Sequence, residues 1–310
     1  MPTRARQMIA DRPGEPEVLR LVEAELPDPG PGEVLVRIAA AGLNPADFKS
    51  LERGGGEVPL RPGFEVVGSI AALGPGASIV GGGGAVDDRV VAFRVTGGYA
   101  SALLVPARDV LRAPAALDDA QAANLLLAGT TAADLLHEAG VRGGETVLLH
   151  GASGAVGVSL LQQARELGVR VIGTASPERF DEVRRFAGEP VAYGDGLEQR
   201  VRDLAPDGID AAFDCAGTEE AFAVSVALVA DRARVLTVVA PDLAQRFGVR
   251  ARGGENSRQY RDEARARVVA LAEAGRLEVP VARTFALEEA PEALRLLRTG
   301  HPGGKLALVP

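Results

Sequence analysis

The sequence predicts an α/β protein with two domains, one β-rich and one built on a doubly wound parallel sheet. Three observations predict this architecture. Short apolar segments separated by Gly- and Pro-rich turns occupy the first part of the chain, which is typical of a barrel or partial barrel. Strand and helix patterns alternate from Thr146 onward, as in a doubly wound sheet. The length of 310 residues is more than one small core requires.

The β-rich domain is expected to comprise residues 1–122 and 275–310. Its predicted strands are 34–39, 66–72, 89–93 and 102–105, with PDPGPGE, RGGGEVPLRPG and GGGG as turn segments. In the tail, the pattern predicts a strand at 281–285, a helix at 289–297 and a last strand at 305–309. We expect this tail to fold back onto the N-terminal domain.

The parallel-sheet domain is expected to comprise residues 123–274. Strands are predicted at 146–150, 169–174, 191–193, 209–214 and 234–239, and helices between them at 156–167, 178–186, 197–204 and 219–230. A polar stretch at 250–259 is expected to be mobile, and a long helix is predicted near 260–274.

Composition limits the class of partner and the compartment. The net charge of −8 argues against a nucleic-acid or anionic-membrane surface, and the absence of Trp argues against an aromatic platform for bases. The single cysteine, Cys215, cannot form an internal disulfide and suits a reducing compartment. No apolar signal core or membrane-length run is present, so cytoplasmic residence is expected.

The segment TVLLHGASGAVGVSLLQQARELGVRVIGTAS, starting at Thr146, carries the strongest functional signal. A strand leads into a turn that holds Gly151, Gly154 and Gly157 at a spacing of three, and a helical pattern follows. Such a turn lets the backbone approach a pyrophosphate and directs the first helical amides at it. Glycine triads also occur in ordinary loops, but the strand–turn–helix context is the one that the motif requires. We therefore predict a nicotinamide cofactor, with its pyrophosphate held by backbone amides of Ser153, Gly154, Ala155 and Val156.

The end of the second strand indicates which nicotinamide cofactor is bound. An NAD site usually has Asp or Glu there, to hold the ribose 2′-hydroxyl. This chain instead reads GTASPER from Gly173 to Arg179, and its first acid lies beyond a proline that opens the next helix. Next to Thr174 at the strand end, Ser176 and Arg179 can bind a 2′-phosphate, which predicts NADPH over NADH. The alternative is that Arg179 is an ordinary solvated arginine.

No metal site is predicted. Catalytic zinc needs three protein ligands, and structural zinc needs four. One cysteine and three widely spaced histidines (His137, His150 and His301) provide neither set.

Several segments, in this order, resemble the medium-chain dehydrogenase/reductase superfamily, and within it the zinc-independent, zeta-crystallin-like NADPH:quinone oxidoreductase branch. They are AAGLNPADFK, PGFEVVGSIAALGPG, GGYASALLVPA, LLAGTTAADLL, VLLHGASGAVG and GGKLALVP. The resemblance covers nearly the whole chain and implies a GroES-like catalytic domain, a Rossmann domain and a homodimer, formed through the sheet edge near 233–239. Where zinc-dependent relatives carry ligand Cys and His, this chain has Leu43-Asn44-Pro45 and Phe64.

The resemblance also implies roles for single residues. Asn44 would lie beside the nicotinamide and hold the ribose or donate to the acceptor oxygen, or Asn-Pro simply forms a turn. Phe48 would line the substrate pocket or belong to the core. Tyr99 would be a proton donor or a packing residue. Thr130 would contact the nicotinamide end, act as N-cap of a helix at 131–138, or do both.

The remaining implied cofactor contacts are Tyr193, Cys215, Ala216, Ala240, Gly304 and Lys305. Cys215 has the alternative of a buried structural cysteine, and Lys305 that of a solvated strand end. Relatives commonly carry a lysine on the helix after the second strand, where this chain has Arg179-Phe180.

The implied reaction is hydride transfer from NADPH to a quinone or an α,β-unsaturated ketone, in the cleft between the domains. A conjugated acceptor delocalises the incoming charge, so the protein supplies mainly positioning and a hydrogen bond to the oxygen. Two alternatives remain open: an enoyl-thioester reductase of fatty-acid or polyketide assembly, and a non-enzymatic NADPH-binding redox sensor.

Overall fold

The computed structural model describes residues 3–54, 57–299 and 302–310. The chain forms two compact units, one of Met1–Leu127 with Ala266–Pro310 and one of Ala128–Arg265. The sequence had placed these boundaries at 122 and 275. The difference at the second boundary arises because Val268, Leu271 and Ala272 are buried in a core with Leu111 and Leu125 of the first unit.

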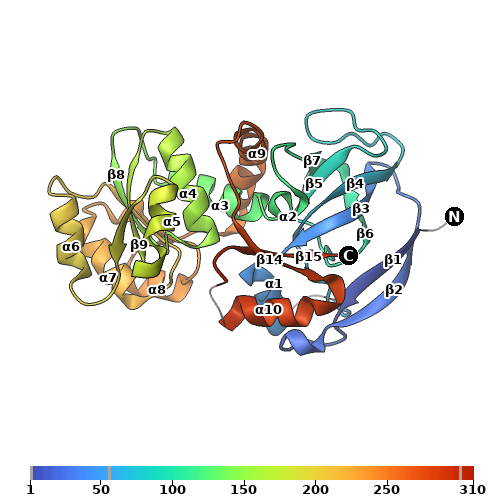
Figure 1. Cartoon of the computed structure of the whole chain (residues 1–310), viewed down its shortest axis with the longest axis horizontal. Coiled ribbons are helices and arrows are strands. Elements are labelled where there is room, and N and C mark those ends of the chain that lie inside the picture. Colours follow the sequence, from blue (N-terminus) through green and yellow to red (C-terminus); the bar gives the residue numbers. More distant parts are fainter. Residues whose placement is uncertain (1–2, 55–56, 300–301) are drawn as a thin grey trace. The chain divides into compact units, whose positions relative to one another are not determined.

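The first unit is built on a seven-stranded sheet with the order β14-β15-β3-β4-β5-β7, in which β6 pairs with β3. The strands are β3 (Glu33–Gly42), β4 (Glu65–Leu73), β5 (Arg89–Phe93), β6 (Ala102–Pro106), β7 (Val110–Arg112), β14 (Val281–Ala286) and β15 (Lys305–Val309). β15 pairs antiparallel with β3, so the predicted return of the tail is confirmed. Figure 1 shows the red C-terminal strands beside the blue β3 in this unit.

Helices α1 (Pro45–Arg53), α2 (Asp119–Ala122) and α10 (Ala290–Thr299) complete this unit. A hairpin of β1 (Thr3–Ile9) and β2 (Arg20–Leu26) was not predicted. Its strands carry alternating charges, and Arg4 lies opposite Glu25 in the register, with 4.0 Å between Arg4 Nε and Glu25 Oε1. Opposite charges on paired strands stabilise one another, but charged residues are poor strand signals in a sequence.

The second unit contains a six-stranded sheet, all parallel, with the order β10-β9-β8-β11-β12-β13. The strands are β8 (Thr146–His150), β9 (Arg170–Ala175), β10 (Glu189–Ala192), β11 (Ala211–Asp214), β12 (Val235–Thr237) and β13 (Arg250–Ala251). The order reverses between β8 and β11, and ligands of such sheets bind beyond the carboxyl ends of the strands at that point. The doubly wound parallel sheet is thereby confirmed.

The helices between Leu126 and Glu273 are α3 (Leu126–Glu138), α4 (Ala155–Glu166), α5 (Phe180–Arg185), α6 (Leu197–Leu204), α7 (Glu219–Leu228), α8 (Pro241–Phe247) and α9 (Gly254–Glu273). From Ala266 onward, α9 belongs to the first unit. Because α3 begins at Leu126, Thr130 lies inside it and is not its N-cap, which corrects that alternative. β12 lies between β11 and β13, so residues 233–239 do not form the sheet edge through which a dimer was expected.

The expectation of a mobile stretch at 250–259 is wrong, because β13 and the first residues of α9 lie there. Its polar side chains have a buried partner in Asp134, which is 1% exposed. Arg252 Nη2 lies 2.6 Å from Asp134 Oδ1, and Ser257 Oγ lies 2.6 Å from Asp134 Oδ2. A polar sequence therefore becomes ordered through a carboxylate distant in the chain.

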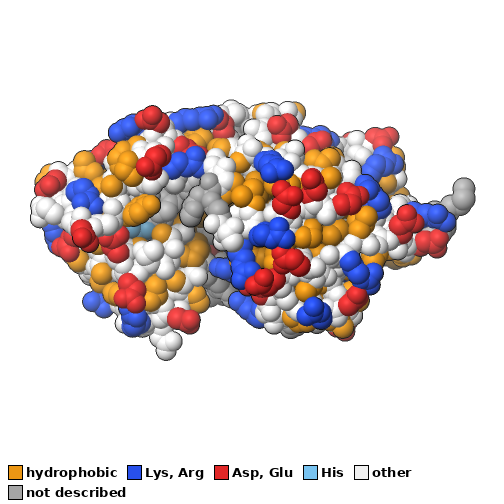
Figure 2. All heavy atoms as spheres, turned by 60° about the horizontal axis from the view of Figure 1, so that its bottom comes forward, with side chains coloured by type: hydrophobic (Ala, Val, Ile, Leu, Met, Phe, Trp, Pro, Cys, Tyr) orange, Lys and Arg blue, Asp and Glu red, His pale blue; other side chains and the backbone are white. Residues whose placement is uncertain are grey.

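No helix among the described residues is long and apolar enough to span a membrane. On the face drawn in Figure 2, basic and acidic side chains are interspersed. Arg170–Glu189 and Arg202–Glu198 are examples of ion pairs between partly exposed side chains in the second unit.

The turn between β8 and α4 depends on close backbone packing at Gly157. A Cβ at this position would lie 2.3 Å from the Gly151 carbonyl oxygen and 2.6 Å from that of Ala152. Backbone atoms cannot move aside as a flexible side chain can. Glycine at this position therefore allows α4 to start directly against the end of β8.

Gly157→Ala is expected to lower the free energy of unfolding by about 1–3 kcal/mol, the usual cost of overpacking. Gly154→Ala is the matched control, because its φ is −78° and the nearest atom to its Cβ would be 3.3 Å away. The control should lose less than about 1 kcal/mol. Urea denaturation followed by circular dichroism measures both, and equal losses would contradict the packing argument.

Candidate functional site

The β8–α4 turn presents uncapped backbone amides at the carboxyl end of the parallel sheet. Gly151 has a φ of 76°, which favours glycine, and its amide donates to Thr174 Oγ1 at 3.2 Å. Gly154 is the N-cap of α4 and offers no side-chain oxygen, so the first amides of this twelve-residue helix lack intrahelical partners. Ser153 and Val156 are half-buried, and Gly154 and Ala155 are exposed. This arrangement fits an anion.

Two buried side chains hold the loops that follow the neighbouring strands β11 and β12. Asp214 Oδ1 accepts from the amides of Ala216 (3.0 Å) and Gly217 (2.8 Å), and its Oδ2 accepts from Thr237 Oγ1 (2.7 Å). Thr237 Oγ1 in turn accepts from the amide of Ala240 at 3.3 Å. Sequence reasoning missed Asp214 and Thr237. The sequence did offer a signal for Asp214, because a carboxylate is unusual as the last residue of a predicted apolar strand, here 209–214.

The predicted contact residues Cys215, Ala216 and Ala240 thus lie in loops of fixed shape. A Cβ on Gly151 would lie 3.2 Å from the Cys215 carbonyl carbon, so the glycine turn packs directly against the loop after β11. Burial raises the pKa of the Cys215 thiol, with the Asp214 charge acting in the same direction. The thiol therefore stays protonated, as a structural cysteine does.

The end of β9 has the features predicted for a 2′-phosphate site. Ala175, the last residue of β9, is not a carboxylate, and Pro177 opens a helical turn with Ser176 as its N-cap. The first acid after the strand is Glu178, and hydrogen bonds from its own backbone amide and from the Ser176 side chain lower the pKa of that carboxyl. Arg179 is partly exposed, and its Nη1 lies 3.3 Å from Glu182 Oε2. Tyr193, after β10, is 58% exposed. The ion pair with Glu182, on the following helix α5, therefore holds the Arg179 side chain close to its own backbone, three residues after Ser176.

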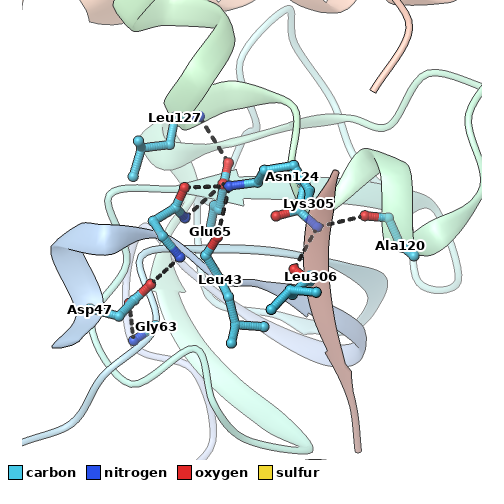
Figure 3. A network of polar contacts seen from close by, with 10 residues as sticks. Leu43, Asp47, Gly63, Glu65, Ala120, Asn124, Leu127, Lys305 and Leu306 are labelled. Atoms are coloured by element: carbon cyan, nitrogen blue, oxygen red, sulfur yellow. Dashed lines mark hydrogen bonds and ion pairs between the residues drawn. The ribbon is translucent and has the colours of Figure 1, made fainter. Parts of the chain in front are cut away.

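In the first unit, a buried polar network surrounds Asn44, which is 1% exposed. Asp47 Oδ2 accepts from the Asn44 amide at 2.7 Å, and Asp47 Oδ1 accepts from the Gly63 amide at 3.0 Å. Glu65 Oε1 accepts from Asn44 Nδ2 at 2.9 Å, and Glu65 Oε2 accepts from the Leu127 amide at 2.8 Å. Figure 3 shows these carboxylates pointing into the network from α1 and β4.

Lys305 enters the same network from the tail and is only 6% exposed, so it is not a solvated strand end. Its Nζ donates to the Leu43 carbonyl (2.8 Å) and to Asn44 Oδ1 (2.5 Å), and lies 3.8 Å from Glu65 Oε1. Burial lowers the pKa of Lys305, and Glu65 and Asp47 oppose that shift. A Cβ on Gly304 would lie 2.9 Å from the Pro280 carbonyl oxygen. Glycine at this position therefore lets the tail pass close to the backbone at Pro280.

Three other predicted residues are placed as follows. Tyr99 is fully buried, and burial together with the neighbouring charges of Asp47 and Glu65 raises the pKa of its hydroxyl well above the ordinary value. Phe48 is half-buried and packs against the core of its unit. Thr130 is buried in α3, where its Oγ1 accepts from Arg261 Nε at 3.3 Å.

A cavity of about 490 Å³ lies in the first unit, beside the end of α1. Phe64 lines it and Phe48 does not. The lining also includes the apolar Leu51, Leu60 and Pro62, the polar Ser50 and Thr96, and the charged Glu57 and Arg61.

Within the described ranges, no group of three or more His, Cys, Asp or Glu side chains is arranged to hold a metal ion. His137 stacks on Tyr260 with ring centroids 3.8 Å apart. His150 Nε2 lies 3.1 Å from Ser225 Oγ, and burial lowers the pKa of His150 to about 4. His301 lies outside the described residues.

Asp47 predicts a specific pH dependence of stability. Burial raises its pKa from 3.8 to about 7, against the opposing hydrogen bonds from Asn44 and Gly63. Between these values the folded chain holds the proton more tightly than the unfolded chain does. The contribution of Asp47 to stability is therefore largest below about pH 4, falls as the pH rises towards 7, and is constant above.

The difference in unfolding free energy between wild type and Asp47→Asn should accordingly decrease from about pH 4 to about pH 7 and then level off. Urea denaturation at a series of pH values measures it. A difference that does not vary with pH would show that Asp47 is not the titrating group.

Lys49 and Lys305 are the only lysines in the chain, which makes their reactivities directly comparable. Lys49 is exposed and Lys305 is buried. Reductive methylation of the folded protein should modify Lys49 and leave Lys305 unmodified, as read by peptide mass spectrometry. Both should react after denaturation. Equal modification of the two in the folded protein would contradict the buried network.

Two family models match the chain. The alcohol dehydrogenase GroES-like domain matches residues 30–115, and the zinc-binding dehydrogenase family matches residues 187–308. Among solved structures, mycobacterial Rv1454c complexed with NADPH has a TM-score of 0.84 and 28% identity, covering 99% of this chain and 100% of that one. A Pseudomonas syringae quinone oxidoreductase has a TM-score of 0.85 and 27% identity, with the same coverage.

Three curated proteins are similar in sequence. The 2-haloacrylate reductase of a Burkholderia species is 29% identical, over 97% of this chain and 98% of that protein. Human quinone oxidoreductase is 37% identical, over 55% of this chain and 52% of that protein. The PikAII polyketide synthase component of Streptomyces venezuelae is 31% identical, over 96% of this chain and 8% of that protein. With these matches and the two units described above, the chain belongs to the medium-chain dehydrogenase/reductase superfamily and is similar to its quinone oxidoreductases.

Proposed function

We propose that this protein is an NADPH-dependent reductase that transfers hydride to a quinone or an α,β-unsaturated carbonyl compound. The observation that carries the proposal is the glycine turn at the point where the strand order reverses, together with a strand β9 whose last residues, Thr174 and Ala175, are not carboxylates. A similar chain, mycobacterial Rv1454c, forms a complex with NADPH.

The residues present fit this cofactor. The amides of Ser153, Ala155 and Val156 would hold the pyrophosphate, with Gly151 and Gly157 allowing its close approach. The amide of Gly154, also predicted as a contact, already donates to the Gly151 carbonyl at 3.1 Å. Ser176 and Arg179 would bind the 2′-phosphate, with Thr174 behind them and Tyr193 beside the adenosine. Cys215, Ala216 and Ala240 would border the nicotinamide half. For Thr130, Gly304 and Lys305, a position near the cofactor is proposed from the family resemblance alone. When bound, NADPH supplies the hydride.

The chemistry of the acceptor is supported by the relatives. Quinones and 2-haloacrylate share a C=C bond conjugated to a carbonyl or carboxyl group, and these are the compounds for which the two relatives are named. Such an acceptor places negative charge on its oxygen as hydride arrives, and a fixed donor stabilises that charge. In this chain Asn44 is the proposed donor. Tyr99 is buried among core residues, which favours its packing role, and we assign product protonation to water.

A second function, reduction of an enoyl thioester, is favoured by one observation. The match to the PikAII polyketide synthase component extends over 96% of this chain. The chemistry at the reacting carbon is the same, and the two functions differ in whether the acceptor is free or carrier-bound.

NADPH oxidation followed at 340 nm with 1,4-benzoquinone, 9,10-phenanthrenequinone, a simple enone and an enoyl thioester tests the proposal. We expect turnover with at least one quinone or enone. Turnover with the enoyl thioester alone would support the second function. Absence of turnover with all four, while NADPH still raises the melting temperature, would overturn both and favour a redox sensor.

Arg179→Gln should raise KM for NADPH about tenfold or more, the value of one charge-assisted contact, and leave KM for NADH within about twofold. Arg184→Gln is the matched control, since Arg184 lies on α5, the helix that follows Arg179 directly, and pairs with an exposed carboxylate, Asp181. The control should alter neither constant. Equal effects of Arg179→Gln on both cofactors would refute phosphate recognition by this residue.

A further inference from the structure

The buried Lys305 ammonium and Glu65 carboxylate lie on either side of the Asn44 side chain and determine which way its amide faces. An ammonium group has only donors, and a carboxylate has only acceptors. Asn44 Oδ1 must therefore face Lys305, at 2.5 Å, and Nδ2 must face Glu65, at 2.9 Å. The opposite orientation would set two donors against each other at Lys305 and two acceptors against each other at Glu65.

The backbone on both sides of this amide is fixed as well. Asp47 accepts from the Asn44 amide, and the amide of Leu43 donates to the Leu306 carbonyl at 3.1 Å, which joins β15 to the start of α1. Asn124 Nδ2 also donates to the Leu306 carbonyl, at 3.0 Å. The network therefore holds the main chain and the side chain of Asn44 at once.

One donor remains uncommitted. Asn44 Nδ2 carries two hydrogens, and the network accounts for one of them, the bond to Glu65. The second has no partner among the described residues. A buried donor without a partner costs free energy, so this hydrogen is suited to a bound acceptor. The ammonium group at Oδ1 withdraws charge from the amide and strengthens the N–H as a donor.

We propose that Lys305 is a positioning residue which, with Glu65, orients and polarises the Asn44 amide so that its second N–H donates to the oxygen of the hydride acceptor. This inference rests on the proposed reductase function. It explains why a charged side chain occupies a buried position that an apolar residue of similar size would fill at lower cost.

The orientation is tested in the free enzyme by NMR of the Asn side-chain amides, with the Asn44 signal assigned by its loss in Asn44→Ser. In wild type its two protons should give separate, slowly exchanging signals. Lys305→Met should shift both and increase their exchange with solvent at least tenfold, whereas Lys49→Met should change neither. Unchanged Asn44 signals in Lys305→Met would overturn the proposal, whatever the kinetics.

The catalytic consequence is tested by steady-state kinetics with the best acceptor. Lys305→Met should lower kcat about a hundredfold, the scale of a misplaced or weakened donor, with KM for NADPH within about threefold of wild type. Lys49→Met should match wild type in both constants.

The doubly neutral variant Lys305→Met/Glu65→Gln separates positioning from charge balance. It should recover the melting temperature lost in Lys305→Met, because no unpaired buried carboxylate remains, but kcat should stay low. Recovery of both would show that Lys305 only neutralises Glu65, and would overturn the proposal. If wild type reduces no conjugated acceptor, the proposed function and its catalytic part fail, while the NMR result still decides the orientation of the amide.

Discussion

The contact of the Lys305 ammonium with Asn44 and Glu65 is the interaction on which the first unit depends. It joins the tail strand β15, the turn before α1 and the central strand β4, which are far apart in the sequence. A buried charge is tolerated only when its partners are placed correctly, so this contact is sensitive to error in any of the three segments. The same sensitivity is useful at a reacting centre, where the orientation of a single amide determines whether it can act.

The second unit solves a different problem, which is to bind a large anion with few charges. Its glycine turn offers backbone amides at the end of β8, and Asp214 and Thr237 hold the neighbouring loops through hydrogen bonds to backbone amides. The site therefore depends on backbone geometry, which tolerates changes in side chains elsewhere. Under our proposal, the side chains that distinguish one nicotinamide cofactor from the other are Ser176 and Arg179, after the end of β9.

Local pattern predicted much of this architecture. The strands at 89–93, 146–150 and 305–309 and the helix at 197–204 lie where their apolar spacing placed them. The hairpin of β1 and β2 was missed because charged residues alternate along it, and 250–259 was misjudged because its order comes from Asp134, on a distant helix. For 250–259 the deciding interaction is a pairing of polar groups far apart in sequence, which local hydrophobicity does not encode.

The same limit applies to the site. The glycine turn is readable because its chemistry is local, whereas the contact of Lys305 with Asn44 joins residues at opposite ends of the chain. The measurement that tests the central claim most directly is isotope transfer from NADPH deuterated at nicotinamide C4, with each of the two C4 positions labelled in turn, to the enone that turns over fastest. Direct hydride transfer predicts one deuterium at the carbon β to the carbonyl in the product from one of the two labelled cofactors. A reduced product without deuterium from either cofactor would contradict the account.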